Sequence, residues 1–240
     1  MISKNDVKYI QSLHHKKTRD KEGLFIAEGP KLLLELLSSQ FEVKQLYALP
    51  VWMEQHPKIN KATEITEGEL EKITALQTPN QVLAVFKQPS LSDEPVLKGC
   101  LSLVLDGIQD PGNLGTIIRI ADWFGICQLI ASEDTADVYN PKVVQATMGS
   151  IARVKVHYKK LPDWLAQTTV PVYGALLNGE NVYNTGEIKE GVLVIGNEGR
   201  GIRADVLPFI KQPLTIPGRG KAESLNAAVA TGIILSHIVK

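Results

Sequence analysis

Residues 100–131 read CLSLVLDGIQDPGNLGTIIRIADWFGICQLIA, an apolar strand pattern followed by a helix pattern and a second strand pattern. We expect strands over 101–105 and 127–131, because apolar residues fill both runs. Asn113 can cap the intervening helix, which stops at Gly125. A helix that joins two strands in this way is typical of a parallel sheet covered on both faces. The stretch therefore predicts an α/β fold for the C-terminal part of the chain.

The same alternation continues toward the C-terminus. Apolar runs cover 172–177, 192–195 and 214–216, and each is followed by a polar or glycine-rich loop. We expect a ligand site among these loops, because ligand sites of α/β proteins collect at the carboxyl ends of parallel strands. The last apolar run, 225–239, is too short and too often interrupted by polar residues to span a bilayer. We interpret it as a buried helix with Ser224 as its N-cap.

The N-terminal part mixes short helix and strand signals. Pro30 opens one apolar helix, and Thr66 with Glu69 forms a capping box for another. Strand patterns cover 43–48 and 81–86. The segment that follows is polar and contains two prolines, which is typical of a linker. We therefore predict a small α/β domain, a linker and a larger α/β domain, with boundaries at 1–88, 89–99 and 100–240.

Charge and targeting signals narrow the possible partners. The chain has 26 basic residues (lysine and arginine together) and 26 acidic ones (aspartate and glutamate together), so a nucleic acid would have to be held by a local basic patch. The N-terminus lacks the apolar stretch of a secretory signal, and we expect a cytoplasmic protein without a membrane partner. The histidines and the two cysteines have no metal-ligand spacing, so we assign no metal.

Three loops of the larger domain carry residues suited to chemistry. The first places Arg119 six residues after Asn113, the second runs from Gly196 to Gly201, and the third leads from Ile216 into the last helix. The glycine spacing of the second loop is not that of a dinucleotide fingerprint, and the third lacks the pattern of a phosphate loop. Taken singly, each loop is also compatible with a plain alternative: a surface arginine, a tight turn and a basic connection.

In this order and spacing, the three loops resemble the signature motifs of the SpoU/TrmH family of the SPOUT superfamily. The resemblance covers about residues 101–240 and implies a trefoil-knotted domain that works as a homodimer and transfers a methyl group from S-adenosylmethionine to a ribose 2′-hydroxyl of RNA. The matching elements are Asn113 and Arg119; Gly196, Asn197, Glu198 and Gly199; and Ile216, Pro217, Ser224, Leu225 and Asn226.

The resemblance also implies roles for particular residues. The implied catalytic residues are Arg119, Asn113, Glu198, Ser224 and Asn226. The implied cofactor-binding residues are Leu177, Asn178, Gly179, Ile195, Gly196, Asn197, Gly201, Ile216, Leu225 and Ala230. Because a guanidinium stays protonated in proteins, we expect Arg119 to grip a phosphate and stabilise the developing alkoxide rather than act as a base. Glu198 would hold Arg119 or a neighbouring loop.

The N-terminal domain resembles the ribosomal-protein-like RNA-binding domain that precedes the methyltransferase domain in many family members. Although the chain has no net charge, this domain has a basic cluster that could bind RNA phosphates. The cluster consists of Lys16, Lys17, Arg19 and Lys21. By this analogy we favour ribosomal RNA over transfer RNA as the substrate. The alternatives are a tRNA 2′-O-methyltransferase and a non-catalytic RNA-binding protein that retains the fold.

Overall fold

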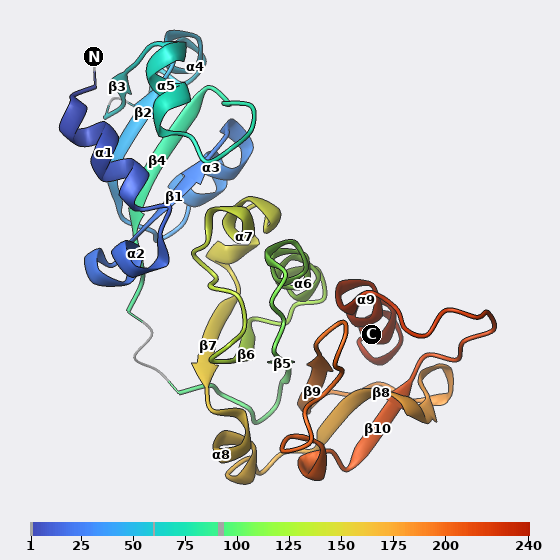
Figure 1. Cartoon of the computed structure of the whole chain (residues 1–240). Helices are drawn as coiled ribbons and strands as arrows, with labels where there is room; N and C mark the ends of the chain where they lie inside the picture. Colours follow the sequence, from blue (N-terminus) through green and yellow to red (C-terminus); the bar gives the residue numbers. More distant parts are fainter. Residues whose placement is uncertain (1, 60, 91–93) are drawn as a thin grey trace. The chain divides into compact units, whose positions relative to one another are not determined.

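The chain forms two compact units in a computed structural model that describes residues 2–59, 61–90 and 94–240 (Figure 1). The N-terminal unit comprises the described residues up to Ser90 together with Asp137–Ala152. The C-terminal unit comprises the described residues from 94 to 136 together with Arg153–Lys240. Residues 91–93 of the predicted linker lie outside the described residues. The predicted α/β class is confirmed for both parts of the chain.

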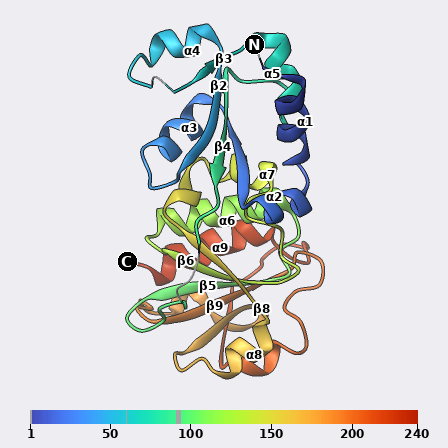
Figure 2. The same ribbon diagram turned by 90° about the vertical axis from the view of Figure 1, so that its left-hand side faces the viewer.

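The N-terminal unit is a mixed sheet with helices on both faces. Its strands run in the order β1-β4-β2-β3, where β4 is antiparallel to β1 and β2, and β3 is parallel to β2. Figure 2 shows α1 and α5 on one side of this sheet and α3 and α4 on the other. The elements are α1 (Lys4–Ser12), α2 (Lys16–Glu22), β1 (Leu24–Glu28), α3 (Pro30–Leu37), β2 (Val43–Ala48), α4 (Pro50–Gln55), β3 (Thr63–Glu64), α5 (Glu67–Ile73), β4 (Val82–Lys87), α7 (Pro141–Ala146) and a 3-10 helix (Ser150–Ala152).

Local sequence signals explain how these helices begin. Pro30 occupies the first turn of α3, where its missing N–H needs no partner. The predicted capping box of α5 is present, with the Thr66 side chain accepting from the backbone of Glu69 and the Glu69 side chain accepting from the backbone of Thr66. Ile10 and Leu13 pack with Leu70 of α5 and with apolar side chains of the sheet in one buried core. This core fixes α1 to both the sheet and α5.

The C-terminal unit is built on a sheet of six parallel strands in the order β10-β8-β9-β5-β6-β7. In Figure 2 helices α6 and α9 lie on one side of this sheet and α8 on the other. No helix in the described ranges is long and apolar enough to cross a bilayer. The elements are β5 (Leu101–Asp106), α6 (Pro111–Trp123), β6 (Gln128–Ser132), β7 (Lys155–Lys159), α8 (Leu161–Ala166), β8 (Val172–Asn181), β9 (Gly191–Gly196), β10 (Gln212–Thr215), α9 (Ala227–Ile238) and two 3-10 helices (Val182–Asn184 and Leu207–Phe209).

The strand order reverses between β5 and β9. From β5 the chain continues through β6 to β7, whereas β9, β8 and β10 lie on the other side of β5. Ligands of open parallel sheets bind at such a switch point, outside the carboxyl ends of the strands. Asp106 and Gly196, which end β5 and β9, are paired there. The parallel sheet therefore brings the first and second of the three loops together. The trefoil knot remains a prediction of the family resemblance.

Both predicted N-caps in the C-terminal unit are wrong, by three residues in α6 and by two in α9. The N-cap of α6 is Asp110, whose carboxylate accepts from the backbone N–H of Asn113 at 2.8 Å, so Asn113 lies inside the first turn. The N-cap of α9 is Asn226 and not Ser224. A carboxylate followed by proline at the first helical position outcompetes Asn113 as a cap. Because Asp110 caps α6, the side-chain amide of Asn113 can bind other partners.

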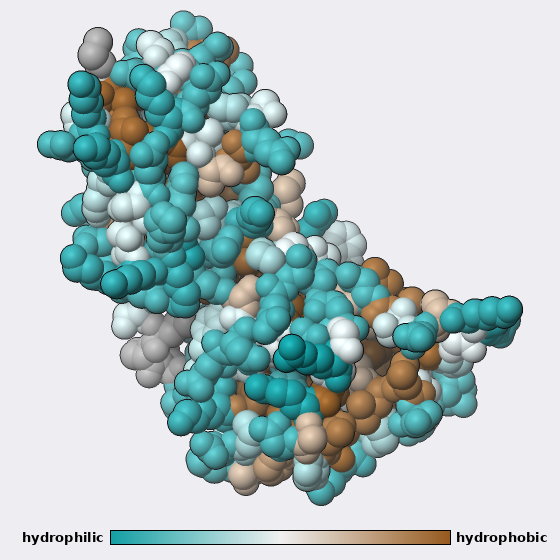
Figure 3. Space-filling model, viewed as in Figure 1, coloured by the Kyte–Doolittle hydropathy of each residue, from teal (hydrophilic) through white to brown (hydrophobic). Residues whose placement is uncertain are grey.

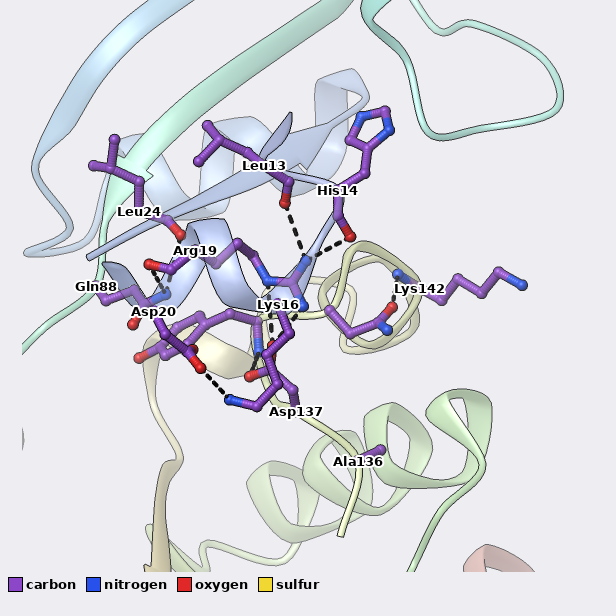
Figure 4. A network of polar contacts seen from close by, with 12 residues as sticks. Leu13, His14, Lys16, Arg19, Asp20, Leu24, Gln88, Ala136, Asp137 and Lys142 are labelled. Atoms are coloured by element: carbon purple, nitrogen blue, oxygen red, sulfur yellow. Dashed lines mark hydrogen bonds and ion pairs between the residues drawn. The ribbon is translucent and has the colours of Figure 1, made fainter. Parts of the chain in front are cut away.

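Residues 137–152 lie between β6 and β7 in the sequence but pack within the N-terminal unit. The guanidinium of Arg19, a residue that is only 1% exposed, donates to one oxygen of Asp137 from Nη2 at 2.6 Å and from Nε at 3.2 Å (Figure 4). Its Nη1 donates to the backbone carbonyls of Leu13 and His14. The ring of Tyr139 packs on that of Phe25, with 4.9 Å between centroids. Charged and aromatic contacts thus fix this segment to α2 and β1.

Candidate active site

Three side chains from the three loops form a hydrogen-bonded chain in the C-terminal unit. The amide nitrogen of Asn226 donates to Oδ1 of Asn113 at 2.8 Å. The amide nitrogen of Asn113 in turn donates to Oε1 of Glu198 at 2.5 Å. Asn226 lies 113 residues from Asn113, and Glu198 lies 85 residues from it, so only the fold brings them together. The chain joins all three loops at one place.

The direction of each amide in this chain is determined by its neighbours. Oδ1 of Asn226 accepts from the backbone N–H groups of Ala228 and Val229 at 3.0 and 3.2 Å, so its NH₂ group must face Asn113. Asn113 therefore presents its oxygen to Asn226 and its NH₂ group to Glu198. The Glu198 oxygen can only accept, which an ionised carboxylate does best. The second carboxylate oxygen of Glu198 stays available to a donor on a ligand.

The loop after β9 is closed on itself by backbone hydrogen bonds. Asn197 and Gly201 exchange two of them at 3.0 and 2.9 Å, and Oδ1 of Asn197 accepts from Gly199 and Arg200 within the turn. The Asn197 amide also donates to the carbonyl of Gly107 at 2.8 Å, which ties the loop to the end of β5. A Cβ on Gly196 would lie 2.4 Å from the backbone of Gly201, so the returning chain requires glycine there.

Two of the predicted catalytic side chains are exposed and have no polar partner among the described residues. Arg119 on α6 and Ser224 before α9 are both exposed. Neither side chain makes a hydrogen bond or an ion pair with another described residue. We expected Glu198 to hold either Arg119 or a neighbouring loop. Glu198 accepts from Asn113 of the first loop and does not contact Arg119, so the second alternative agrees with the structure. Both exposed side chains are free to contact a substrate.

The residues predicted to bind the cofactor lie in and beside loops that have exposed apolar side chains and backbone N–H groups without a partner among the described residues. Leu177 on β8 and Leu225 before α9 are 75% and 46% exposed, which is unusual for leucine. Across 216–225 no backbone N–H donates a hydrogen bond to another described residue. Apolar walls with unused backbone donors suit the adenine and ribose of an adenosyl group. The other predicted residues lie in β8 (Asn178, Gly179), at the end of β9 (Ile195, Gly196), in its loop (Asn197, Gly201), after β10 (Ile216) and in α9 (Ala230).

Apolar side chains also gather on the surface of this unit. Figure 3 shows them where α9 and the strands β8 and β10 lie. A hollow of about 380 Å³ lies between α6 and α9, beside the hydrogen-bonded chain. It is lined by Asn113, Thr116, Ile120, Asn226, Ala228, Val229, Gly232 and Ile233. Val229 is 51% exposed, and Trp123 near the end of α6 is 85% exposed. The helical face next to the site is therefore largely apolar and uncovered in the single chain.

An ion pair that we did not predict lies at the base of the site. Asp106 is fully buried, and its two oxygens accept from the backbone N–H of Arg203 at 2.8 Å and from its Nε at 2.6 Å. Asp106 is the polar last residue of an otherwise largely apolar strand, and functional side chains of such folds usually lie at this end, so this position could have identified it. No local pattern distinguishes Arg203 from an ordinary surface arginine.

The predicted RNA-binding cluster on α2 divides into exposed and buried members. Lys16, Lys17 and Lys21 are exposed, and Lys16 forms an exposed pair with Asp20 at 2.7 Å. Arg19 is instead buried in its ion pair with Asp137. Its guanidinium cannot meet a phosphate there, and we correct the predicted cluster to the three lysines. Among the described residues, no group of three His, Cys, Asp or Glu side chains could hold a metal ion.

Comparison with known proteins agrees with this geometry. Residues 100–236 match the SpoU rRNA Methylase family, and residues 4–84 match the MRM3-like substrate binding domain. A Bacillus subtilis relative, 23S rRNA (guanosine(2553)-2′-O)-methyltransferase RlmP, is 35% identical over 97% of this chain and 95% of its own length.

Solved structures show the same similarity over nearly the whole chain. A putative RNA methyltransferase of the TrmH family from Porphyromonas gingivalis is 41% identical, with a TM-score of 0.87 over 99% of this chain and 98% of that one. The SpoU methyltransferase AviRb from Streptomyces viridochromogenes, solved with AdoMet, is 26% identical, with a TM-score of 0.86 over 99% and 97% of the two chains. The predicted class, an S-adenosylmethionine-dependent RNA 2′-O-methyltransferase, is confirmed. The chain belongs to the SpoU rRNA methylase family.

Proposed function

We propose that this protein methylates the ribose 2′-hydroxyl of one nucleotide in 23S ribosomal RNA. The observation that carries the proposal is the hydrogen-bonded chain from Asn226 through Asn113 to Glu198, with the uncommitted side chains of Arg119 and Ser224 on the flanking elements. The RlmP relative, which is similar over nearly the full length of both chains, supports the choice of 23S rRNA.

The site residues divide the work between holding and stabilising. S-adenosylmethionine, when bound, supplies a methyl group on a sulfonium that needs only an aligned nucleophile. Asn113, whose amide direction is determined, and the exposed Ser224 orient the ribose, because a small error in alignment lowers the rate strongly. Arg119 binds the adjacent phosphate and stabilises the negative charge that develops on the 2′-oxygen. The backbone of 216–225 and the side chains of Leu177 and Leu225 hold the adenosyl part.

A methylation assay tests the proposal directly. Labelled S-adenosylmethionine is incubated with the protein and either 23S rRNA or transfer RNA, and the product nucleosides are separated. We expect label in 23S rRNA, on a nucleotide whose 3′ linkage has become resistant to alkali because its 2′-hydroxyl is blocked. Label on a base would contradict methylation of the ribose. Label confined to transfer RNA would contradict 23S rRNA as the substrate. RNA binding without label would favour the non-catalytic alternative.

We also propose that the protein works as a homodimer through the C-terminal unit. The argument is the apolar face formed by the hollow between α6 and α9, together with the exposed ring of Trp123. A second copy on this face would lie next to Asn113 and Asn226, which line the same hollow, and would exclude water from the site. The mass in solution, measured by sedimentation equilibrium, distinguishes a dimer from a single chain.

The exposed lysines of α2 are expected to contact RNA phosphates. Replacing Lys16, Lys17 and Lys21 together by alanine should weaken RNA binding. The slope of log affinity against log salt concentration should become less negative by about 2–3, because each phosphate contact releases about one counterion. The measurement is RNA affinity by filter binding between low and moderate salt. S-adenosylmethionine affinity serves as the internal control and should not change. An unchanged salt slope would show that these lysines are only solvated.

A further inference from the structure

The carboxylate of Asp106 is a buried charge that the proposed chemistry does not use. It ends β5, the strand at which the order of the sheet reverses, and it lies opposite Gly196 in the ladder with β9. Its exposure is 0%, and both of its oxygens accept hydrogen bonds from Arg203. Arg203 also approaches Asp134 at 3.5 Å through Nη1. A carboxylate taken fully out of water has to be paired, which indicates that Arg203 is a structural requirement for it.

Asp106 marks the place where the loop after β9 both begins and ends. The loop leaves the sheet at Gly196, the ladder partner of Asp106, and returns at Arg203, whose backbone N–H donates to Oδ2 of Asp106 at 2.8 Å. The side-chain contact from Nε to Oδ1, at 2.6 Å, adds a second, charge-assisted bond. One carboxylate therefore fastens the returning end of the loop beside its starting point.

The family resemblance assigns residues of this loop to cofactor binding, namely Gly196, Asn197 and Gly201. Glu198 and the backbone around Gly196 and Gly201 lie between the two ends. The Asn197–Gly201 bridge holds the interior of the loop, whereas the bonds from Arg203 to Asp106 hold its returning end. If the loop opened at this end, the charge of Asp106 would lose its partners inside the protein, so the pair makes opening unfavourable. A loop held closed in advance loses less entropy when it binds a ligand.

We propose that Asp106 and Arg203 are a positioning pair that keeps the 196–202 loop closed in the form that binds S-adenosylmethionine. The pair acts through the loop and makes no contact with the cofactor. The inference rests on the proposed function, because it assigns the loop to that cofactor.

Arg203→Ala tests the pair, because it removes the side-chain bond to Asp106 and keeps the backbone N–H of residue 203; circular dichroism first checks that the variant is folded. The affinity for S-adenosylmethionine, measured by calorimetry, should fall by about tenfold, as expected for the loss of a hydrogen bond to a charged group. Without cofactor, trypsin should cleave after Arg200, which lies exposed in the loop, faster than in the unmodified protein. Arg203→Lys keeps a positive charge near Asp106 and should restore part of both properties.

Arg153→Ala is the matched control. Arg153 pairs with Asp122 at 2.9 Å in the same unit, and its side chain is 49% exposed against 40% for Arg203. This variant should lose stability without a change in cofactor affinity or in cleavage after Arg200. Equal cofactor affinity in Arg203→Ala and the unmodified protein, or equal weakening in the Arg153→Ala control, would overturn the positioning role. If the unmodified protein itself fails to bind S-adenosylmethionine, the proposed function is wrong and the inference falls with it.

Discussion

Replacing Arg119 by alanine is expected to lower the rate of methyl transfer at least about a hundredfold, the scale for removing one preorganised donor that stabilises developing charge. The side chain is exposed and has no partner among the described residues, so its loss should change neither the fold nor cofactor affinity. Single-turnover methylation of 23S rRNA gives the rate, and calorimetry with S-adenosylmethionine gives the affinity. Loss of cofactor binding, or unchanged turnover, would show that Arg119 is not the catalytic residue.

Arg119→Lys separates two forms of this role. Lysine keeps the positive charge but not the planar, two-pronged donor that grips a phosphate. A loss as severe as that of Arg119→Ala would indicate that bidentate contact is required, whereas near-full activity would indicate that charge alone suffices. Asp122→Ala, further along the same helix, is a control for effects on α6, because Asp122 pairs with Arg153 and does not line the hollow between α6 and α9.

Asp137→Ala is expected to lower the free energy of unfolding by about 3–5 kcal/mol, because it leaves the buried guanidinium of Arg19 without its counter-charge. The side chains of Arg19 and Asp137 are only 2% and 10% exposed, so water cannot replace the lost partner. Denaturation by urea, followed through circular dichroism, measures the effect.

Asp20→Ala is the control for this substitution, since it breaks the Lys16–Asp20 pair on the same helix. The side chains of that pair are 62% and 52% exposed, and such a pair contributes about 0.3–0.5 kcal/mol. Similar losses from Asp137→Ala and Asp20→Ala would contradict the account of Arg19 as a buried charge that depends on Asp137.

Local signals predicted part of the elements: seven apolar runs correspond to strands, whereas β1, β3 and β7 were not predicted. The β2 strand agrees with the predicted run 43–48, and the other predicted runs differ from the observed strands mostly at their ends. The misplaced caps show where local signals compete. Asp110 and Asn113 both suit an N-cap, and Pro111 at the first helical position favours Asp110 over the predicted Asn113.

Contacts between distant residues could not be predicted in the same way. The bond from Asn113 to Glu198 became visible only when the parallel sheet placed their loops together. Arg19 looked like one more basic residue on a polar helix, because the partner that buries it lies 118 residues further along the chain. Periodicity reports which face of a helix is apolar, and it carries no information about a charge that finds its partner in another segment.

The packing of residues 137–152 on the N-terminal unit has a consequence for how the protein is made. A nascent chain emerges from the ribosome in order, and a domain can complete its folding only when all of its segments are outside. The N-terminal unit must therefore wait for Asp137 and Tyr139, while β5, α6 and β6 have already emerged. Completion of the first unit therefore overlaps in time with the synthesis of the second.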